Sequence, residues 1–197
     1  MLVVCTANVS RSPLAAALLR NRLVDAPHVV VDSAGLKQVR VGVDERAVDA
    51  GRALGVDISE HRPHTVTREQ IALADLVIGM TRAHVRELVL VDGGSFDKTF
   101  TLKELSRRSQ AQRDPIAARP ERWRVALEHG RSKGDLMGED ARDDIADPYG
   151  RSPSEHQQVA EELANHVSLV VNELLRLVAP SQYQNPHAAI PPSTPAR

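Results

Sequence analysis

The start of the chain constrains the fold most, because an apolar run passes through a short polar loop into a helix start. Residues 2–4 are Leu-Val-Val, which is typical of a short buried strand. Ser12 and Pro13 then open an amphipathic stretch over residues 14–23, with serine as the expected N-cap and proline as the first helical residue. A strand that leads through a tight loop into a helix is typical of the first unit of an α/β fold.

The alternation of strand and helix patterns continues along the chain. Apolar or β-branched runs predict three further strands, at residues 28–31, 74–80 and 99–102. Periodic apolar positions predict two further helices, at residues 45–54 and 82–90. Thr81 is the expected N-cap of the second of these helices. The order of elements predicts an α/β fold with a mostly parallel sheet.

The last predicted helix has the clearest amphipathic pattern. Ser152 and Glu155 match a capping box, and behind them apolar residues recur at spacings of three and four over residues 159–177. From residue 179 onward, five prolines lie among Ser, Gln and Asn, so residues 179–197 are expected to be a disordered tail. The sequence therefore predicts one domain over residues 1–178 and a tail after it.

Residues 103–135 form an arginine-rich insert within this domain. Its periodicity is weak, and one helix is expected around residues 120–130. The arginines between positions 107 and 131 are interpreted as a solvated face, with docking of an acidic phosphoprotein as the alternative. Trp123 is interpreted as a packing anchor rather than a substrate contact.

Composition argues against several classes of protein. The chain of 197 residues has a formal net charge of -1 and 3% aromatic residues, which argues against binding to nucleic acid or acidic membranes. One cysteine allows neither an internal disulfide nor a thiolate-rich metal cage. The chain opens without a basic, apolar leader, and no stretch approaches about 18 apolar residues. A cytoplasmic protein without a membrane span is therefore expected.

Residues 5–12, Cys-Thr-Ala-Asn-Val-Ser-Arg-Ser, carry the chemistry of the sequence. A loop at a helix N-terminus can turn its N–H groups inward as an anion-binding nest, which favours a reactive thiolate at Cys5. Arg11 offers a planar fork to two phosphate oxygens. Ser12 can donate a hydrogen bond to the sulfur, and Asn8 can adopt a positive φ that curves the loop. The alternative is a buried cysteine that serves only as a small hydrophobic residue.

A second element is the segment Asp147-Pro148-Tyr149. As local structure, Asp-Pro followed by Gly150 is a turn before the last helix. As chemistry, attack of a thiolate on phosphorus requires a proton for the departing oxygen, and Asp147 is a natural donor. Acidic residues precede it, and they either disfavour its ionisation or are simply solvated: Glu139, Asp140, Asp143 and Asp144.

Together these residues resemble the low-molecular-weight protein tyrosine phosphatase family. The family's pattern is a cysteine, five residues and Arg-Ser near the N-terminus, with an Asp-Pro-Tyr loop late in the chain. Here the two parts are residues 5–12 and 147–149. Further similar segments are residues 33–35, 42–44 and 74–81. The resemblance covers residues 1–178 apart from the arginine-rich insert.

The resemblance implies a three-layer α/β fold, in which helices flank a four-stranded parallel sheet and a phosphate-binding loop follows the first strand. It implies a protein-tyrosine phosphatase that forms a phosphocysteine on Cys5, without a metal or other cofactor. Arg11 would bind the phosphate, and Asp147 would act as general acid and base. The other residues of the loop would be Thr6, Ala7, Asn8, Val9, Ser10 and Ser12. Tyr149 would form a wall of the pocket and stack on the phosphotyrosine ring of a protein substrate.

Three positions depart from the family's pattern. Ser10 stands where many members have a second cysteine, so Cys5 is expected to be sensitive to peroxide. Ala7 replaces a glycine, which restricts the backbone of the loop. Val39 or Arg40 replaces an aromatic residue that often faces the substrate, which weakens the case for a tight phosphotyrosine slot.

Three alternative functions are compatible with a loop of this kind. Similar thioredoxin-coupled arsenate reductases need further cysteines, which this chain lacks. Relatives that act on phosphoarginine tend to carry threonine where Val9 stands, so the apolar side chain favours an aromatic phosphoester. A catalytically silent phosphoprotein-binding module would typically have lost Cys5, Arg11 or Asp147, and all three are present.

The pair His61 and His64 raises the question of a metal site. A proline lies between the two histidines, and no cysteine is close in sequence. A role in packing a loop, or on the surface, is therefore expected rather than metal ligation.

Overall fold

The computed structural model describes residues 1–111, 125–137, 140 and 142–178. Its centre is a four-stranded parallel sheet in the order β2-β1-β3-β4. The strands are β1 (Leu2–Cys5), β2 (Asp32–Gly35), β3 (Val77–Gly79) and β4 (Thr99–Thr101). The α-helices are α1 (Arg11–Arg22), α2 (Glu45–Ala53), α3 (Arg68–Leu73), α4 (Arg82–Val91), α5 (Leu102–Ala111) and α7 (Pro153–Val178). The 3-10 helices are η1 (Gly93–Lys98) and η3 (Lys133–Leu136).

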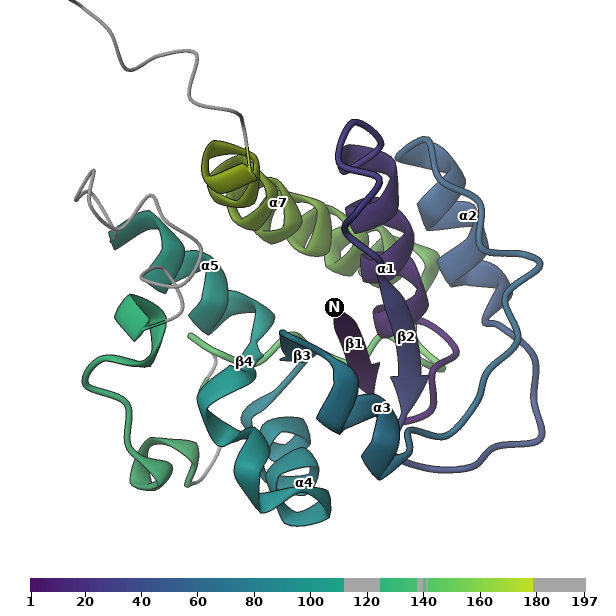
Figure 1. The fold of residues 1–197 in the computed structure, drawn as a ribbon. Coiled ribbons are helices and arrows are strands. Elements are labelled where there is room, and N and C mark those ends of the chain that lie inside the picture. The colour runs from purple at the N-terminus through teal and green to yellow at the C-terminus, as the bar shows by residue number, and fades with distance from the viewer. Residues whose placement is uncertain (112–124, 138–139, 141, 179–197) are drawn as a thin grey trace, which may run out of the picture.

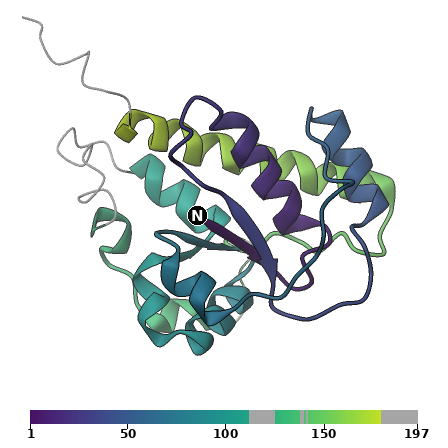
Figure 2. The same cartoon turned by 45° about the vertical axis from the view of Figure 1, so that its right-hand side comes forward.

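Helices cover both faces of the sheet, and the molecule therefore has three layers (Figure 1). On one face, α1, α2 and α5 pack against the long helix α7. On the other face, α3 and α4 cover a smaller hydrophobic cluster. The view turned by 45° keeps α7 across α1 on one side of the sheet and α4 on the opposite side (Figure 2). The predicted α/β fold with a four-stranded parallel sheet is confirmed.

The central strand β1 is buried on both faces. Val3 and Cys5 belong to the larger cluster beneath α1 and α7. Leu2 and Val4 belong to the smaller cluster beneath α3 and α4. Because successive side chains of a strand point to opposite faces, a strand between two helical layers needs an unbroken apolar run. This burial explains the Leu-Val-Val start and fixes Cys5 at the carboxyl end of the sheet.

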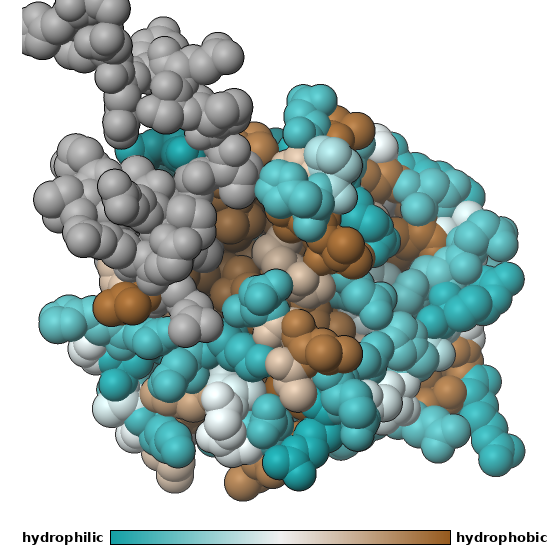
Figure 3. Space-filling model, in the orientation of Figure 1, coloured by the Kyte–Doolittle hydropathy of each residue, from teal (hydrophilic) through white to brown (hydrophobic). Residues whose placement is uncertain are grey.

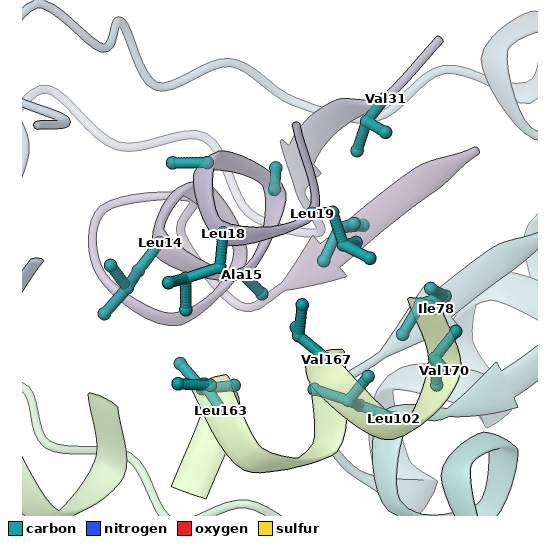
Figure 4. Packing of buried hydrophobic residues seen from close by; sticks show 14 of the residues in the cluster. Leu14, Ala15, Leu18, Leu19, Val31, Ile78, Leu102, Leu163, Val167 and Val170 are labelled. Carbon is teal, nitrogen blue, oxygen red and sulfur yellow. The ribbon is translucent and has the colours of Figure 1, made fainter. Parts of the chain in front are cut away.

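Helices α1 and α7 hold the larger cluster together. Leu14 and Leu18 of α1 lie opposite Leu163 and Val167 of α7, and all four side chains are buried (Figure 4). Full burial of an aliphatic side chain contributes about 1.5–3 kcal/mol. The predicted last helix is confirmed as α7, which begins at the predicted capping box next to Ser152.

The strand predicted at residues 28–31 is wrong, because β2 comes later, at Asp32–Gly35. The β-branched run instead follows a turn in which the Val29 N–H donates to the Ala26 carbonyl at 2.9 Å. The register of the sheet pairs Cys5 with Gly35. Where β2 ends beside the loop after β1, there is room only for small residues. The β-branched side chains of residues 28–31 would not fit there.

The predicted N-cap of the first helix is also wrong. Helix α1 begins at Arg11, and Ser10 occupies the N-cap position without a side-chain hydrogen bond. The hydroxyl of Ser12 lies inside the first turn and donates to the sulfur of Cys5 instead. Two helices were not predicted, α3 and α5. The first is short, and the second lies at the start of the arginine-rich insert.

The insert is not only a solvated face, which corrects the interpretation of its arginines. The side chain of Arg131 is 3% exposed. Its guanidinium donates to the carbonyls of Phe96 and Thr99 at 2.8 and 2.7 Å and to Glu104 at 2.8 Å. It also lies 4.0 Å from the centre of the Phe100 ring. Arg131 therefore ties the insert to β4 and α5 by charge, hydrogen bonds and stacking.

Several predictions concern segments that the structure describes only in part or not at all. Residues 125–128 are helical, within the range of the helix expected at 120–130. Trp123 and the tail over residues 179–197 lie outside the described residues. The domain boundaries of 1–178 stay a prediction.

The described helices include none that is long and apolar enough to cross a membrane. Figure 3 shows hydrophilic side chains over much of one face, with hydrophobic side chains reaching the surface in several places. Leu73 and Leu90 are the most exposed large hydrophobic residues, each at 84%. Single exposed aliphatic residues are normal on a protein surface.

We expect Arg131→Lys to lower the free energy of unfolding by about 2 kcal/mol, because lysine lacks the fork that satisfies two carbonyls and a carboxylate. Arg142→Lys is the matched control, since the Arg142 side chain is 81% exposed, and it should change stability by less than about 0.5 kcal/mol. Urea unfolding of both variants measures the difference. Equal stability of the two variants would contradict the structural role of Arg131.

Candidate active site

The loop between β1 and α1 surrounds the side chain of Cys5. Cys5 ends β1 and is 3% exposed. Asn8 has a φ of 58°, in the left-handed region, and this turns the loop back toward the helix. Gly35 of β2 lies against the loop, because a Cβ there would stand 2.9 Å from the carbonyl carbon of Ala7. The positive φ predicted for Asn8 is therefore confirmed, and a close approach at Gly35 is added to it.

Two hydrogen-bond donors point at the sulfur of Cys5. The backbone N–H of Asn8 lies 3.3 Å from the sulfur, and Oγ of Ser12 lies 3.1 Å from it. Donors directed at a sulfur stabilise its anionic form. Helix α1 starts directly behind the loop, and the partial positive charge of its N-terminus acts in the same sense.

The side-chain amide of Asn8 sets the direction of these hydrogen bonds. Its Oδ1 accepts from Nε2 of His61 at 2.9 Å and from the backbone N–H of His64 at 3.2 Å. Its Nδ2 donates to Oγ of Ser12 at 2.9 Å and to Oγ of Ser33 at 3.0 Å. Because Ser12 already accepts a hydrogen from Asn8, its own hydrogen is available to the sulfur.

His61 thus belongs to the support of the loop, in agreement with the predicted packing role. Burial lowers the pKa of His61, so its ring is neutral near pH 7. Nε2 also contacts the carbonyl of Asn8 at 3.1 Å, and since both partners are acceptors, Nε2 carries the hydrogen. The described residues contain no group of three or more His, Cys, Asp or Glu side chains that could hold a metal ion.

Arg11 joins the loop to a segment far along the chain. Its side chain is 4% exposed, while that of Asp147 is 49% exposed. One terminal nitrogen of the guanidinium binds Oδ2 of Asp147, and the other donates to the carbonyl of Ile145 at 3.1 Å. A buried guanidinium without partners would cost several kcal/mol. The carboxylate and the carbonyl therefore fix where Asp147 lies relative to Cys5.

Two of the acidic residues before Asp147, namely Asp140 and Asp143, are paired with arginines rather than simply solvated. Glu139 lies outside the described residues. Arg82 binds Asp143 at 2.7 Å and Asp140 at 3.1 Å. Burial opposes ionisation of Asp143, but hydrogen bonds from Arg82 and Arg107 hold its pKa below the ordinary value. Hydrogen bonds from Arg142 likewise lower the pKa of Asp140. Asp140 and Asp143 therefore support the segment that leads to Asp147 as members of ion pairs.

A cavity of about 310 Å³ opens over the sulfur. Its lining comes from the loop after β1, the loop after β2 and the segment before α7: Cys5, Thr6, Ala7, Val9, Ser10, Arg11, Val39, Val41, Asp147 and Tyr149. Two further residues predicted for the loop, Asn8 and Ser12, are buried and contact the sulfur and each other. The structure therefore brings every site residue predicted from the sequence to one place.

The residues that line the cavity differ in exposure. Val9, from the loop after β1, is 5% exposed. Tyr149 is 58% exposed and Val41 is 50% exposed, and they come from different loops. The lining from the loop after β1 is therefore fixed by packing at Val9, whereas Tyr149 and Val41 are open to solvent.

The N-terminus of α2 connects the two halves of the site. The backbone N–H of Asp44 donates to the carbonyl of Val9 at 2.8 Å. Its carboxylate contacts Nε2 of His156, on α7, at 2.9 Å. Arg46 binds the carbonyl of Arg151, just before α7. The beginning of α2 therefore holds the loop after β1 and the segment before α7 in a fixed relation.

Sequence reasoning did not identify three residues of the site, namely Ser33, Val41 and His84, and it gave His61 only a general packing role. Ser33 lies in the Ser-Ala-Gly segment, which was a signal, although its contact with Asn8 was not predictable. His84 lies three positions after the helix cap Thr81, which placed it on the first turn of α4. Nothing in the sequence shows that this turn faces the loop, where Nε2 of His84 lies 2.9 Å from Oγ1 of Thr6.

A protein-family model described as "Low molecular weight phosphotyrosine protein phosphatase" matches residues 1–122 of the chain. The chain belongs to this family. A probable low molecular weight protein-tyrosine-phosphatase, EpsP, of Ralstonia nicotianae is 36% identical over 129 residues, which are 65% of this chain and 86% of the relative. A protein-arginine-phosphatase of Geobacillus stearothermophilus is 34% identical over 143 residues, which are 71% and 93% of the two chains.

A solved low molecular weight protein tyrosine phosphatase from T. tengcongensis has the same fold. The TM-score is 0.64 and the sequences are 27% identical, with coverage of 87% of this chain and 97% of that chain. The fold and the family of this phosphatase domain therefore agree with the resemblance read from the sequence motifs.

We expect Gly35→Ala to lower both stability and phosphatase activity, because its Cβ would stand 2.9 Å from the backbone of Ala7. Overpacking of this kind costs about 1–3 kcal/mol, and a shifted loop should lower kcat/KM by about tenfold or more. Gly93→Ala is the control, since a Cβ there meets no atom within 4 Å. Urea unfolding and hydrolysis of para-nitrophenyl phosphate measure both effects. Wild-type activity of Gly35→Ala would contradict the close approach.

Proposed function

We propose that this protein is a protein-tyrosine phosphatase that hydrolyses phosphomonoesters through a phosphocysteine on Cys5. The observation that carries the proposal is the meeting of a thiol, a buried guanidinium and a carboxylate at one cavity. Among the described residues, no carboxyl group other than that of Asp147 lines that cavity. We further propose that it acts on phosphoproteins in the reducing cytoplasm, where a thiol nucleophile persists.

In the first step, the sulfur of Cys5 attacks phosphorus and the bond from phosphorus to the leaving oxygen breaks. The fork of Arg11 binds two phosphoryl oxygens, and inward N–H groups of the loop bind the others. A phosphoryl group offers the guanidinium a pair of oxygens like that of the carboxylate. It therefore replaces Asp147 on Arg11 and leaves the carboxylate beside the leaving group.

Asp147 then gives its proton to the departing oxygen, so the alcohol leaves neutral. A dianion next to the carboxylate favours its protonated form, which supports this role. In the second step, water attacks the phosphocysteine, Asp147 takes the proton of that water, and the bond from phosphorus to sulfur breaks. Ser12 stabilises the sulfur anion as it leaves, through the hydrogen bond that it donates.

The substrate side chain that fits this cavity best is aromatic. Three apolar side chains line the cavity, those of Val9, Val39 and Val41, and Tyr149 offers a ring for stacking. Phosphoarginine is the second candidate, because one relative is named a protein-arginine-phosphatase. An apolar residue at position 9 supports phosphotyrosine, since it offers a guanidinium no hydrogen-bond partner.

Cys5→Ser should abolish the hydrolysis of para-nitrophenyl phosphate in the presence of EDTA, because the nucleophile is lost. Arg11→Lys should lower kcat/KM by at least about a hundredfold, because the bidentate contact with the transition state is lost. Arg176→Lys is the control, since its side chain is 61% exposed, pairs with Glu173 near the end of α7 and is absent from the cavity lining. Activity that persists in Cys5→Ser, or that EDTA removes from the wild type, would contradict the mechanism.

The same assay separates the alternatives. Peptides with phosphotyrosine should be hydrolysed faster than matched peptides with phosphoarginine, and the reverse order would assign the enzyme to phosphoarginine. A folded, reduced wild type that binds phosphopeptides without turnover would be a silent binding module instead.

Asp147→Asn should slow hydrolysis most for substrates with poor leaving groups, because those depend on proton donation. We expect a loss of about 10²–10⁴-fold for alkyl phosphates or peptide phosphotyrosine, and a clearly smaller loss for activated aryl phosphates. Asp97→Asn is the control, since Asp97 is exposed and distant from the cavity lining. A series of aryl phosphates with graded leaving groups measures the trend. Equal losses across the series would exclude Asp147 as the acid.

A further inference from the structure

His84 contacts the loop around Cys5 from behind. Its side chain is 5% exposed, and Nε2 lies 2.9 Å from Oγ1 of Thr6. Thr6 directly follows Cys5 and lines the cavity. A buried imidazole that touches the phosphate-binding loop has no part in the mechanism described above.

The fold holds His84 in this place from two directions. The backbone N–H of His84 donates to Oγ1 of the N-cap Thr81 at 3.2 Å, which fixes the first turn of α4. Gly79 at the end of β3 lets this turn approach, since a Cβ there would stand 3.2 Å from Cβ of His84. The imidazole therefore has little freedom to leave Thr6.

The ring of His84 is neutral at the pH at which phosphatases work. Burial first, and the positive charge of Arg11 second, lower the pKa of His84 to about 3. A neutral imidazole carries one hydrogen, on either Nδ1 or Nε2. Which nitrogen carries it decides whether His84 donates to Thr6 or accepts from it.

The surroundings of Nδ1 decide this question. Nδ1 is buried, and no hydrogen-bond partner for it exists among the described residues. A hydrogen on Nδ1 would therefore be a buried donor without an acceptor, which is rare and costly in proteins. A hydrogen on Nε2 is instead donated to Oγ1 of Thr6 and leaves only a lone pair on Nδ1.

The hydroxyl of Thr6 has one hydrogen and two lone pairs. If it accepts from Nε2 of His84, its own hydrogen stays available. In the part of the chain that the structure describes, this hydroxyl has no other hydrogen-bond partner. Since Thr6 lines the cavity, the free hydrogen can serve a ligand there.

We propose that His84 is a positioning residue that donates from Nε2 to Thr6 and so directs the Thr6 hydroxyl hydrogen to a phosphoryl oxygen in the cavity. Thr6 is then an additional donor beside Arg11 and the backbone N–H groups. The proposal rests on the proposed phosphatase function for its effect on rate. The hydrogen on Nε2 can be tested without any turnover.

The first experiment records a long-range ¹H–¹⁵N NMR spectrum at pH 7 of protein whose histidines are labelled with ¹⁵N. The signal that disappears in His84→Gln is assigned to His84. The ¹⁵N shifts of His84 should identify the neutral tautomer with hydrogen on Nε2. A hydrogen on Nδ1 would overturn the proposal, because Thr6 would then have to donate to the ring. A doubly protonated ring would overturn it as well.

The second experiment measures inhibition by inorganic vanadate and kcat/KM for para-nitrophenyl phosphate. Thr6→Val keeps the shape of the side chain without the hydroxyl, and it should weaken vanadate inhibition by about tenfold to a hundredfold. Thr6→Ser restores the hydroxyl and should recover most of that loss. His84→Leu should resemble Thr6→Val, and the double variant should be no worse than either single variant.

Vanadate inhibition of Thr6→Val within about twofold of the wild type would overturn the proposal, as would losses that multiply in the double variant. Thermal unfolding of each variant shows whether it is folded. If His84→Leu does not fold, Thr6→Val against Thr6→Ser still decides the role of the hydroxyl. A wild type without Cys5-dependent turnover would contradict the proposed function, whereas the spectrum would still test the tautomer.

Discussion

The hydrogen bonds of the Asn8 side chain are the constraint on which the rest of the site depends. Asn8 is fully buried and adopts a positive φ, a conformation that a non-glycine residue keeps only when its surroundings fix it. Its amide is saturated by His61, His64, Ser12 and Ser33. These partners come from three separate parts of the chain. The curvature that aims the Asn8 N–H at the sulfur therefore depends on contacts with three parts of the fold rather than on the loop alone.

A second constraint is the burial of Arg11. A guanidinium that is 4% exposed needs partners, and they come from a segment 136 positions later in the sequence. The chain between them builds β4, α5 and the insert that Arg131 ties down. Helix α7 then packs on α1. The contact of His156 on α7 with Asp44 holds the start of α2 next to the loop after β1 and the segment before α7. Placing one carboxylate beside one thiol thus explains much of the architecture.

The sequence predicted the elements that have a local signature, and it failed where the cause was tertiary. The strand β1, the cap Thr81 and the capping box at Ser152 follow from patterns within a few residues. The position of β2 does not, because a close contact between Gly35 and the loop overrides the β-propensity of residues 28–31. Motif order also predicted the residues that meet at the cavity. The contact of His84 was beyond prediction because it depends on which face of a helix meets the core. The contacts of Arg131 were beyond prediction because they join a loop residue to segments 35 and 32 positions earlier in the sequence.

The residues around the sulfur and the residues that can contact the rest of a substrate differ in their burial. The residues that contact the sulfur are buried, as is Arg11, which we propose to bind the phosphoryl group, and their hydrogen bonds are made within the protein. A change there alters a satisfied network, and the cost is felt in stability as well as in rate. Tyr149 and Val41 are about half exposed, and their backbones belong to loops. Such positions can change without disturbing the network beneath them. Substitutions at the exposed positions can therefore alter which substrates fit the cavity while the buried hydrogen bonds around the sulfur stay in place.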